Sequence, residues 1–309
     1  MKKSSLLKII QRFPNQKILV IGDVMLDWWI EGTAERLSPE APVPIVKKTG
    51  DQYFLGGAGN VAANISTLEG KVKLIGAIGR DSNGEKISRL AKEKNIEFII
   101  GGYQKITTAK IRVSAGGHQI TRIDEEKINP IYIDSKILIS EAEKAQVIIL
   151  SDYAKGIVTQ KLMNDLEKYK RKMLVDPKPQ NKNLYKRVYL ITPNKLEAEE
   201  MANKKDFFDA GELLRKKLGA NILITRGEKG MSLFNGGEIY LPTYAKEVYD
   251  VTGAGDTVIG TIALALSAKA SLKDAAIIAN HAAGIVVGKK GTAQTNIEEL
   301  SKKIKEYKE

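Results

Sequence analysis

The chain has 309 residues, 43% hydrophobic and 28% charged, which is ordinary for a soluble globular protein of one large α/β domain or two smaller ones. It contains no cysteine and two histidines, which excludes disulfides, thiol chemistry and a histidine-rich metal site. The net charge is +12, but lysines are spread among Asp and Glu, so we expect anionic small substrates as partners and neither nucleic acid nor membrane.

The first predicted strand covers residues 17–23 and ends in a turn. Before it, residues 1–12 lack the apolar core and the small-residue cleavage site of a signal peptide. No apolar run in the chain is long enough to span a bilayer, so we expect a cytoplasmic protein. Ligands of open α/β sheets bind beyond the carboxyl ends of the strands, which makes Asp23 and Asp27 candidate substrate ligands.

Two segments, approximately residues 28–50 and 105–125, predict a small β-sheet lid. The first contains two tryptophans and three prolines, and prolines exclude a helix interior and a central strand; a surface loop remains the alternative. The second has two alternating strands on either side of a glycine pair at 116–117, which is a hairpin signal. The apolar content of the first segment predicts a homodimer that pairs through the lid.

A glycine-rich turn at residues 56–64 opens another predicted helix. Its Gly-x-Gly-x-x-Ala pattern nearly matches a dinucleotide fingerprint, so an NAD-dependent dehydrogenase is one alternative function. That fingerprint requires a hydrophobic strand immediately before the first glycine. Residues 51–55 are a poor strand of this kind, which weakens the alternative.

From residue 135 the pattern alternates between helices and strands, which indicates a parallel sheet with helices on both faces. The predicted segments are helices at 135–144 and 159–170 and strands at 147–150, 173–175 and 188–191. Each strand ends in a polar cluster, at 151–156, 176–178 and 192–197. Because the carboxyl ends of parallel strands share one edge of the sheet, we expect a binding site there.

The third of these clusters contains the motif Asn194-x-x-Glu197 at the start of a helix. Hard oxygen ligands of this kind suit Mg²⁺. The alternative is a capping role, because Asn followed three residues later by Glu is also a helix N-terminal pattern. Further along, residues 222–230 form a strand and a glycine turn, and an alanine-rich helix that contains His281 is predicted at 272–287.

The motif Asp-Val-Thr-Gly-Ala-Gly-Asp at residues 250–256 runs directly into an apolar helix. Glycines let a ligand approach the backbone, and the free amides at the start of a helix favour an anion such as a phosphoryl group. A carboxylate at that position repels a phosphate, so its presence needs a chemical reason. Asp256 is therefore a candidate general base toward a hydroxyl that attacks a phosphate, with helix capping as the alternative.

Together, the motifs at 56–64, 194–197 and 250–256 resemble those of the ribokinase-like (PfkB) family of sugar and nucleoside kinases. The resemblance implies a three-layer α/β/α sandwich with a mostly parallel central sheet and a small β-sheet lid, all in one domain over residues 1–309. It also implies ATP as phosphoryl donor, Mg²⁺, and a monovalent cation near Asp250 and Thr252.

The resemblance assigns roles to individual residues. Asp256 is the catalytic base, and the anion hole is formed by Gly253, Ala254 and Gly255. The implied sugar ligands are Asp27, Gly56, Gly57 and Asn60, and Asp23 is added to them because of its place at the strand end. The implied nucleotide ligands are Asn194, Thr225, Gly227, Gly230, Thr252, Gly255 and His281. Mg²⁺ is held by Glu197 through water, together with Asn194. A phosphate on the substrate would need cations, and the candidates are Lys110, Arg112, Arg122, Lys155 and Lys178.

Four segments, 22–27, 38–44, 151–156 and 175–178, resemble more closely the bacterial D-glycero-β-D-manno-heptose 7-phosphate kinases. These phosphorylate O1 of the sugar on the route to ADP-heptose and the lipopolysaccharide core, and many carry a fused nucleotidyltransferase domain. The chain ends at Glu309, so we expect a stand-alone kinase whose product is used by a separate adenylyltransferase. The alternatives are another sugar or nucleoside kinase of the family and a catalytically silent sugar-binding or regulatory protein.

Overall fold

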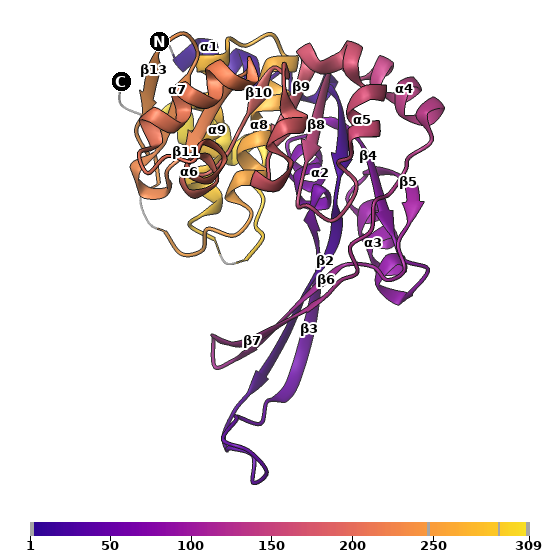
Figure 1. Cartoon of the computed structure of the whole chain (residues 1–309). Coiled ribbons are helices and arrows are strands. Elements are labelled where there is room, and N and C mark those ends of the chain that lie inside the picture. Colours follow the sequence, from indigo (N-terminus) through magenta and orange to yellow (C-terminus); the bar gives the residue numbers. More distant parts are fainter. Residues whose placement is uncertain (1–2, 246–247, 290, 307–309) are drawn as a thin grey trace.

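The computed structural model describes residues 3–245, 248–289 and 291–306, and its centre is a nine-stranded sheet (Figure 1). The strands follow the order β13-β12-β11-β10-β9-β8-β1-β4-β5, parallel from β5 to β11 and antiparallel in β12 and β13. Their bounds are β1 Lys17–Gly22, β4 Lys71–Ile78, β5 Glu97–Tyr103, β8 Val147–Ser151, β9 Met173–Asp176, β10 Leu190–Ile191, β11 Asn221–Thr225, β12 Met231–Phe234 and β13 Glu238–Leu241.

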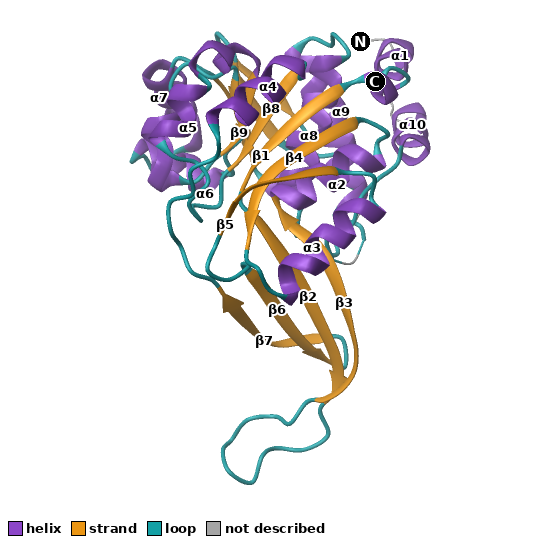
Figure 2. Cartoon of the chain, turned by 90° about the vertical axis from the view of Figure 1, so that its right-hand side faces the viewer, coloured by secondary structure: helices purple, strands orange, loops and turns teal. Residues whose placement is uncertain are grey.

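Alternating apolar side chains of the parallel strands build a separate core on each face of this sheet. On β1, Ile18 and Val20 point into one core, and Leu19 and Ile21 point into the other. The first core is covered by α1 Lys3–Ile10, α2 Ala58–Thr67, α8 Ala254–Ser267, α9 Leu272–Val286 and α10 Ile297–Glu306. The second is covered by α4 Ser135–Lys144, α5 Gln160–Asp165, α6 Lys195–Ala202 and α7 Phe207–Leu218. Figure 2 shows these helices on both faces of the strands.

A second sheet of four strands extends away from the body and forms the lid (Figure 1). Its order is β3-β2-β6-β7, with bounds β2 Val24–Thr33, β3 Lys47–Gly57, β6 Ala109–Ala115 and β7 His118–Glu125. β2 pairs with β6 in parallel, and its pairing with β3 is antiparallel, as is that of β6 with β7. The predicted fold, a mostly parallel sheet with a small β-sheet lid, is confirmed.

The lid strands begin closer to the body than the sequence predicted. β2 starts at Val24, directly after the turn that ends β1, so Asp27 lies on a lid strand. Residues 51–55 belong to β3, an antiparallel lid strand, and not to a strand of the parallel sheet, as a dinucleotide fingerprint would require. The base of the lid packs against α3 Ser82–Glu93.

Some further elements were predicted differently or not at all. The predicted helix at 159–170 is divided into α5 and the 3₁₀-helix η2 Glu167–Lys172. β5 and the hairpin of β12 and β13 were not predicted.

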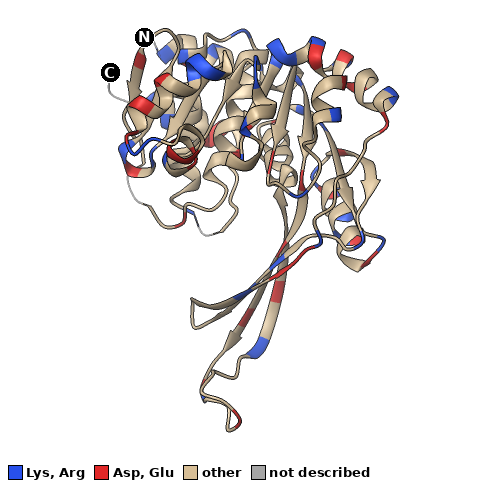
Figure 3. Cartoon of the chain, viewed as in Figure 1, with Lys and Arg blue, Asp and Glu red and all other residues tan. Residues whose placement is uncertain are grey.

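Within the described ranges, no helix is both long enough and apolar enough to cross a membrane. Lys and Arg are interspersed with Asp and Glu over the body and the lid (Figure 3).

The strand order of the sheet reverses at β1. From β1 the strands continue to β4 and β5 on one side and to β8, β9, β10 and β11 on the other. Such a switch point opens a crevice beyond the carboxyl ends of the strands. Three acids follow directly after, or end, strands at this edge, namely Asp23, Asp152 and Asp176.

Candidate active site

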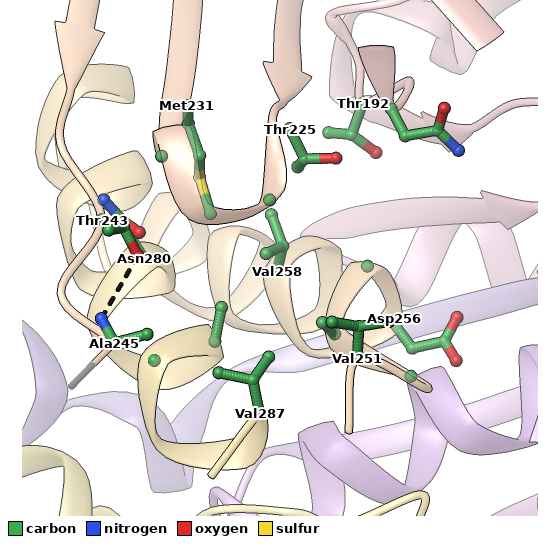
Figure 4. A pocket seen from close by; sticks show the side chains of 18 of the residues that line it. Thr192, Thr225, Met231, Thr243, Ala245, Val251, Asp256, Val258, Asn280 and Val287 are labelled. Carbon is green, nitrogen blue, oxygen red and sulfur yellow. Dashed lines mark hydrogen bonds between the residues drawn. The ribbon is translucent and has the colours of Figure 1, made fainter. Parts of the chain in front are cut away.

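A cavity of about 640 Å³ opens at this carboxyl edge, beside the N-terminus of α8 (Figure 4). One end is polar and contains Asp256, and the other is bounded by Asn280 of α9 and by the segment that contains Thr243 and Ala245. The walls between them are largely apolar and include Met231, Val258 and Val287. A cavity with largely apolar walls and one polar end suits an amphipathic ligand.

The N-terminus of α8 presents backbone amides to the polar end. Gly253, the N-cap, has a φ of 77°, and a Cβ there would lie 2.7 Å from the side-chain nitrogen of Asn60. The amide of Ala254 donates to the carbonyl of Val251 (3.2 Å). The amides of Gly255 and Asp256 lie in the first turn, where an α-helix supplies no partner, and the helix dipole favours an anion there. The predicted anion hole is thus smaller than expected, because the Ala254 amide is already engaged.

Asp256 is buried, with 5% of its surface exposed, and side chains from two distant segments hold it. Asn60 Nδ2 donates to Oδ2 (2.7 Å), and the hydroxyl of Tyr153 donates to Oδ1 (3.1 Å). Burial raises the pKa of Asp256 to about 6, although both hydrogen bonds act in the opposite direction. The N-cap of α8 is Gly253, and no side chain caps the helix, so the capping alternative for Asp256 is wrong.

Two residues that the sequence analysis did not assign, Tyr153 and Asp176, also line the polar end. Burial, and then the charge of Asp256, raises the pKa of the Tyr153 phenol well above its usual range, so it remains a proton donor. Burial and the charges of Asp256 and Glu197 raise the pKa of Asp176. Both residues belong to polar clusters that follow strands, at 151–156 and 176–178, and this signal could have identified them.

Asn194 and Glu197 line the same end and also cap α6. Asn194 Oδ1 accepts from the Glu197 amide (2.9 Å), Glu197 Oε2 accepts from the Asn194 amide (3.0 Å), and Glu197 Oε1 contacts Lys178 Nζ. The described residues contain no group of three or more acids or histidines placed to hold a metal directly. Hard oxygens near the mutually repelling Asp176, Glu197 and Asp256 fit an Mg²⁺ that keeps its water molecules.

The predicted nucleotide ligands divide into two groups. Thr225, Gly227 and Gly230, at the end of β11 and its turn, line the cavity. His281 does not; it is buried and stacks on Tyr244 with ring centroids 4.0 Å apart, because this side of α9 faces the protein interior. The residues of α9 that line the cavity are Asn280, Ala283, Gly284 and Val287.

Thr252 also lies outside the residues that line the cavity. Its amide donates to Asp250 Oδ1 (2.9 Å), and Asp250 Oδ2 accepts from the amide of Gly291 (3.0 Å). Asp250 thus joins the turn before α8 to the segment after α9. The monovalent cation expected near Asp250 and Thr252 stays a prediction.

Asp23 has a different role from the predicted one. It is 1% exposed, and its carboxylate accepts from the amides of Tyr153 (2.8 Å), Lys155 (3.0 Å) and Ile157 (3.1 Å). Burial raises its pKa in spite of these bonds. The geometry contradicts the prediction that Asp23 holds substrate hydroxyls, because both of its oxygens fix the loop at 153–157.

The glycine-rich turn before α2 was also interpreted as a sugar site, and its contacts are internal. A Cβ on Gly57, whose φ is 58°, would lie 2.3 Å from the Asp23 carbonyl oxygen. A Cβ on Gly56 would lie 2.8 Å from the Met25 side chain. Asn60 donates to Asp256, and its Oδ1 accepts from Gln294 Nε2 (3.2 Å). These residues therefore support Asp256 and the packing of β3 on β2 in this structure.

Four of the five cations expected to hold a substrate phosphate lie on or beside the lid. Each forms an ion pair: Arg112 with Asp27 (3.0 Å), Arg122 with Asp124 (2.8 Å), Lys110 with Asp124 (3.8 Å) and Lys155 with Glu126 (2.6 Å). Burial, Arg122 and Lys155 lower the pKa of Lys110, against the pull of Asp124, so Lys110 is close enough to both of these cations to be repelled by them. Lys178 is separate from them and faces the cavity.

Comparison with known proteins identifies the family. A model described as the pfkB family of carbohydrate kinases matches residues 15–299. The chain belongs to this family. It is therefore a phosphotransferase with an alcohol group as acceptor and ATP as donor, which disfavours the NAD-dependent dehydrogenase.

This carbohydrate kinase is similar to proteins named bifunctional protein HldE. That of Sulfurimonas denitrificans is 41% identical over 312 residues, which cover 95% of this chain and 65% of the relative. That of Helicobacter pylori strain Shi470 is 41% identical, with 93% and 66% covered, and that of Syntrophotalea carbinolica is 36% identical, with 97% and 65% covered. The chain thus spans just under two thirds of the length of these curated relatives.

Solved structures share the fold of this kinase. The ribokinase of Arabidopsis thaliana complexed with ribose and ATP superposes with a TM-score of 0.75 at 20% identity, covering 94% of this chain and 99% of that one. Phosphofructokinase-2 of Escherichia coli in complex with potassium gives 0.75 at 17% identity, covering 94% and 98%. At such identities the likeness concerns the fold alone.

Proposed function

We propose that this kinase transfers the γ-phosphoryl group of ATP to O1 of D-glycero-β-D-manno-heptose 7-phosphate, giving the 1,7-bisphosphate for ADP-heptose and lipopolysaccharide core synthesis. The similarity to the HldE proteins and the four heptose-kinase segments support this substrate. The structural observation that carries it is the group of cations Lys110, Arg122 and Lys155 beside the lid, two of which share Asp124 as ion-pair partner; such a group suits a sugar that already bears a phosphate. Because the donor is ATP, we place the reaction in the cytoplasm.

Asp256 acts as the general base in this proposal. It accepts the proton of the substrate hydroxyl, whose oxygen attacks the γ-phosphorus while the bond to the β–γ bridging oxygen breaks and ADP leaves. The hydrogen bonds from Asn60 and Tyr153 hold the carboxylate in position, and a pKa of about 6 keeps it mostly ionised at pH 7. The amides of Gly255 and Asp256 stabilise the transferring group.

The apolar end of the cavity receives the adenine, between β11, β12 and α9, and the polar end receives the phosphates. Asn194 and Glu197 would hold Mg²⁺ through its water molecules. When bound, Mg²⁺ neutralises charge on the nucleotide phosphates. A monovalent cation near Asp250 and Thr252 would fix the turn before α8, and replacement of potassium by choline chloride at equal ionic strength tests for it.

We also propose that the chain forms a single domain and a homodimer through the lid. Trp28 packs on Tyr53, but Leu37 (65% exposed), Val43 (52%) and Ile123 (51%) leave apolar surface on the lid strands and tip. Light scattering at micromolar concentration should give twice the chain mass, and Ile123→Glu should lower it. A monomer in both would contradict the pairing. A separate adenylyltransferase would use the product.

The decisive experiment measures ADP release over a panel of heptose 7-phosphate, unphosphorylated heptose, fructose 6-phosphate, ribose and a nucleoside. We expect the highest kcat/KM with the heptose phosphate and phosphorylation at O1 by phosphorus NMR. A higher kcat/KM with ribose or the nucleoside would refute the heptose substrate and favour another sugar or nucleoside kinase of the family.

A further inference from the structure

Lys178 follows β9 and points into the polar end of the cavity. Among the described residues that line this cavity it is the one Lys or Arg, whereas four acids line it: Asp176, Glu197, Glu228 and Asp256. Its Nζ contacts Glu197 Oε1 and lies 5.4 Å from the ring centroid of Tyr153, whose hydroxyl donates to Asp256. A single cation thus lies between the proposed Mg²⁺ ligands and the base.

The backbone of Lys178 is fixed, and its side chain is long enough to change partner. Its amide donates to the hydroxyl of Tyr185 (3.1 Å), which in turn donates to Asp152 Oδ2 (2.5 Å). Tyr185 is fully buried. The Lys178 side chain, in contrast, is 32% exposed on a flexible four-carbon stem.

The charges in the cavity define what Lys178 can do. Its charge lowers the pKa of both Asp256 and Asp176, which places it within electrostatic reach of the base. Burial lowers its own pKa, but Glu197 and the neighbouring acids raise it by more, so it stays protonated. A triphosphate that enters a cavity lined by four acids needs this cation, because the lid cations do not line the cavity.

We propose that Lys178 is a catalytic residue that leaves Glu197 when ATP binds and donates a hydrogen bond to a non-bridging oxygen of the transferring phosphoryl group. The inference rests on the proposed roles of Asp256 and of the polar end, and it replaces the assignment of Lys178 to the substrate phosphate. The hydroxyl proton goes to Asp256, the new bond joins the hydroxyl oxygen to phosphorus, and the electrons of the broken bond stay on ADP. Lys178 remains protonated, and Glu197, freed from this ion pair, would be available to hold the water molecules of a bound Mg²⁺.

Steady-state kinetics separate a role in transfer from a role in substrate binding. Lys178→Met should lower kcat about 10²- to 10³-fold, with the KM for the sugar phosphate changed less than about twofold. Lys178→Arg keeps the charge, and its kcat should be at least about tenfold higher than that of Lys178→Met. The matched control is Lys155→Met, which removes a lid cation and should raise the KM for the sugar phosphate instead. If Lys178→Met raises that KM while kcat persists, or changes neither constant, the inference is wrong.

A binding measurement tests the same inference without turnover. In the wild type, aluminium fluoride should tighten the binding of ADP, Mg²⁺ and sugar phosphate measured by calorimetry, because it mimics the planar phosphoryl group. Lys178→Met should lose this gain while its affinity for ADP alone stays within about twofold. An unchanged gain overturns the proposal.

Two further measurements keep the outcome interpretable. If Lys178→Met lowers the melting temperature, Lys178→Gln keeps a hydrogen bond to Glu197 without the charge and should show the same loss of kcat; wild-type kcat in a folded Lys178→Gln contradicts the proposal. A wrong heptose assignment is recognised separately, because the wild type then prefers another sugar, and the same variants are measured with that sugar.

Discussion

The carboxyl edge of the nine-stranded sheet and the lid differ in how they hold their charged side chains. At the sheet edge, Asp23 and Asp256 accept hydrogen bonds from the surrounding protein, and burial raises the pKa of both and of Asp176. On the lid, acids such as Asp124 are partly exposed and pair with cations that a ligand can reach. The edge therefore holds fixed carboxyl groups. The lid holds exposed ion pairs that cost little to exchange for a phosphate, although its pair of Arg112 and Asp27 is largely buried.

The largest expected effect is the loss of kcat when Asp256, at the sheet edge, is replaced. Asp256→Asn should lower kcat by about 10²- to 10⁴-fold, because the amide cannot accept the hydroxyl proton. The melting temperature at pH 7 should be unchanged or higher, since the variant no longer ionises a buried carboxyl whose pKa is about 6. Turnover, ADP binding and thermal unfolding are measured on one preparation. Wild-type turnover would remove the base from the mechanism.

Asp23 connects the two regions, and its replacement should affect stability first. Asp23→Ala removes the acceptor of three loop amides and should lower the free energy of unfolding by about 2–4 kcal/mol. Asp23→Asn keeps one oxygen acceptor and should lose less. Urea unfolding followed by circular dichroism measures both. A change below about 1 kcal/mol in Asp23→Ala would show that the loop at 153–157 does not depend on this carboxylate.

Replacement of a lid cation should change the affinity for the substrate. Arg112→Met should raise the KM for the sugar phosphate about 10- to 100-fold and leave kcat within about threefold, because it removes the partner of Asp27 and a cation near the proposed phosphate site. The matched control is Lys48→Met, which breaks the exposed pair of Lys48 and Asp51 on the same sheet and should change neither constant. Equal effects in the two variants would contradict a specific role for Arg112.

The smallest expected effect is the pH dependence set by the sheet edge. Because the base must be ionised and its pKa is about 6, kcat/KM should rise with pH and be about tenfold higher at pH 7 than at pH 5. Lys178→Met should move this midpoint upward, since the Lys178 charge favours the ionised form. The stability of the fold should change in the opposite direction. As pH rises from about 4 to 6, Asp256 ionises in the unfolded chain before it does in the folded one, so the free energy of unfolding falls. A pH-independent kcat/KM would contradict the assignment.

The sequence alone determined those features that depend on neighbouring residues. The alternation of strands and helices predicted a mostly parallel sheet, and the hairpin signal at 116–117 predicted part of the lid. At residues 250–256, glycine, helix start and carboxylate are contiguous, so local geometry brings Asp256 to the polar end of the cavity. Asn194 and Glu197 reach the cavity for the same reason, and their spacing also forms a capping box.

Only the tertiary structure decided which way the remaining side chains face. Asp23 turns to the amides of a loop that lies about 130 residues further along the chain, and Asn60 turns to Asp256. His281 lies on the side of α9 that packs on Tyr244, and Lys178 lines the cavity, whereas the lid cations do not. A strand or helix pattern gives a residue's position along its element. Its partner depends on contacts between distant segments, and these form only when both cores pack.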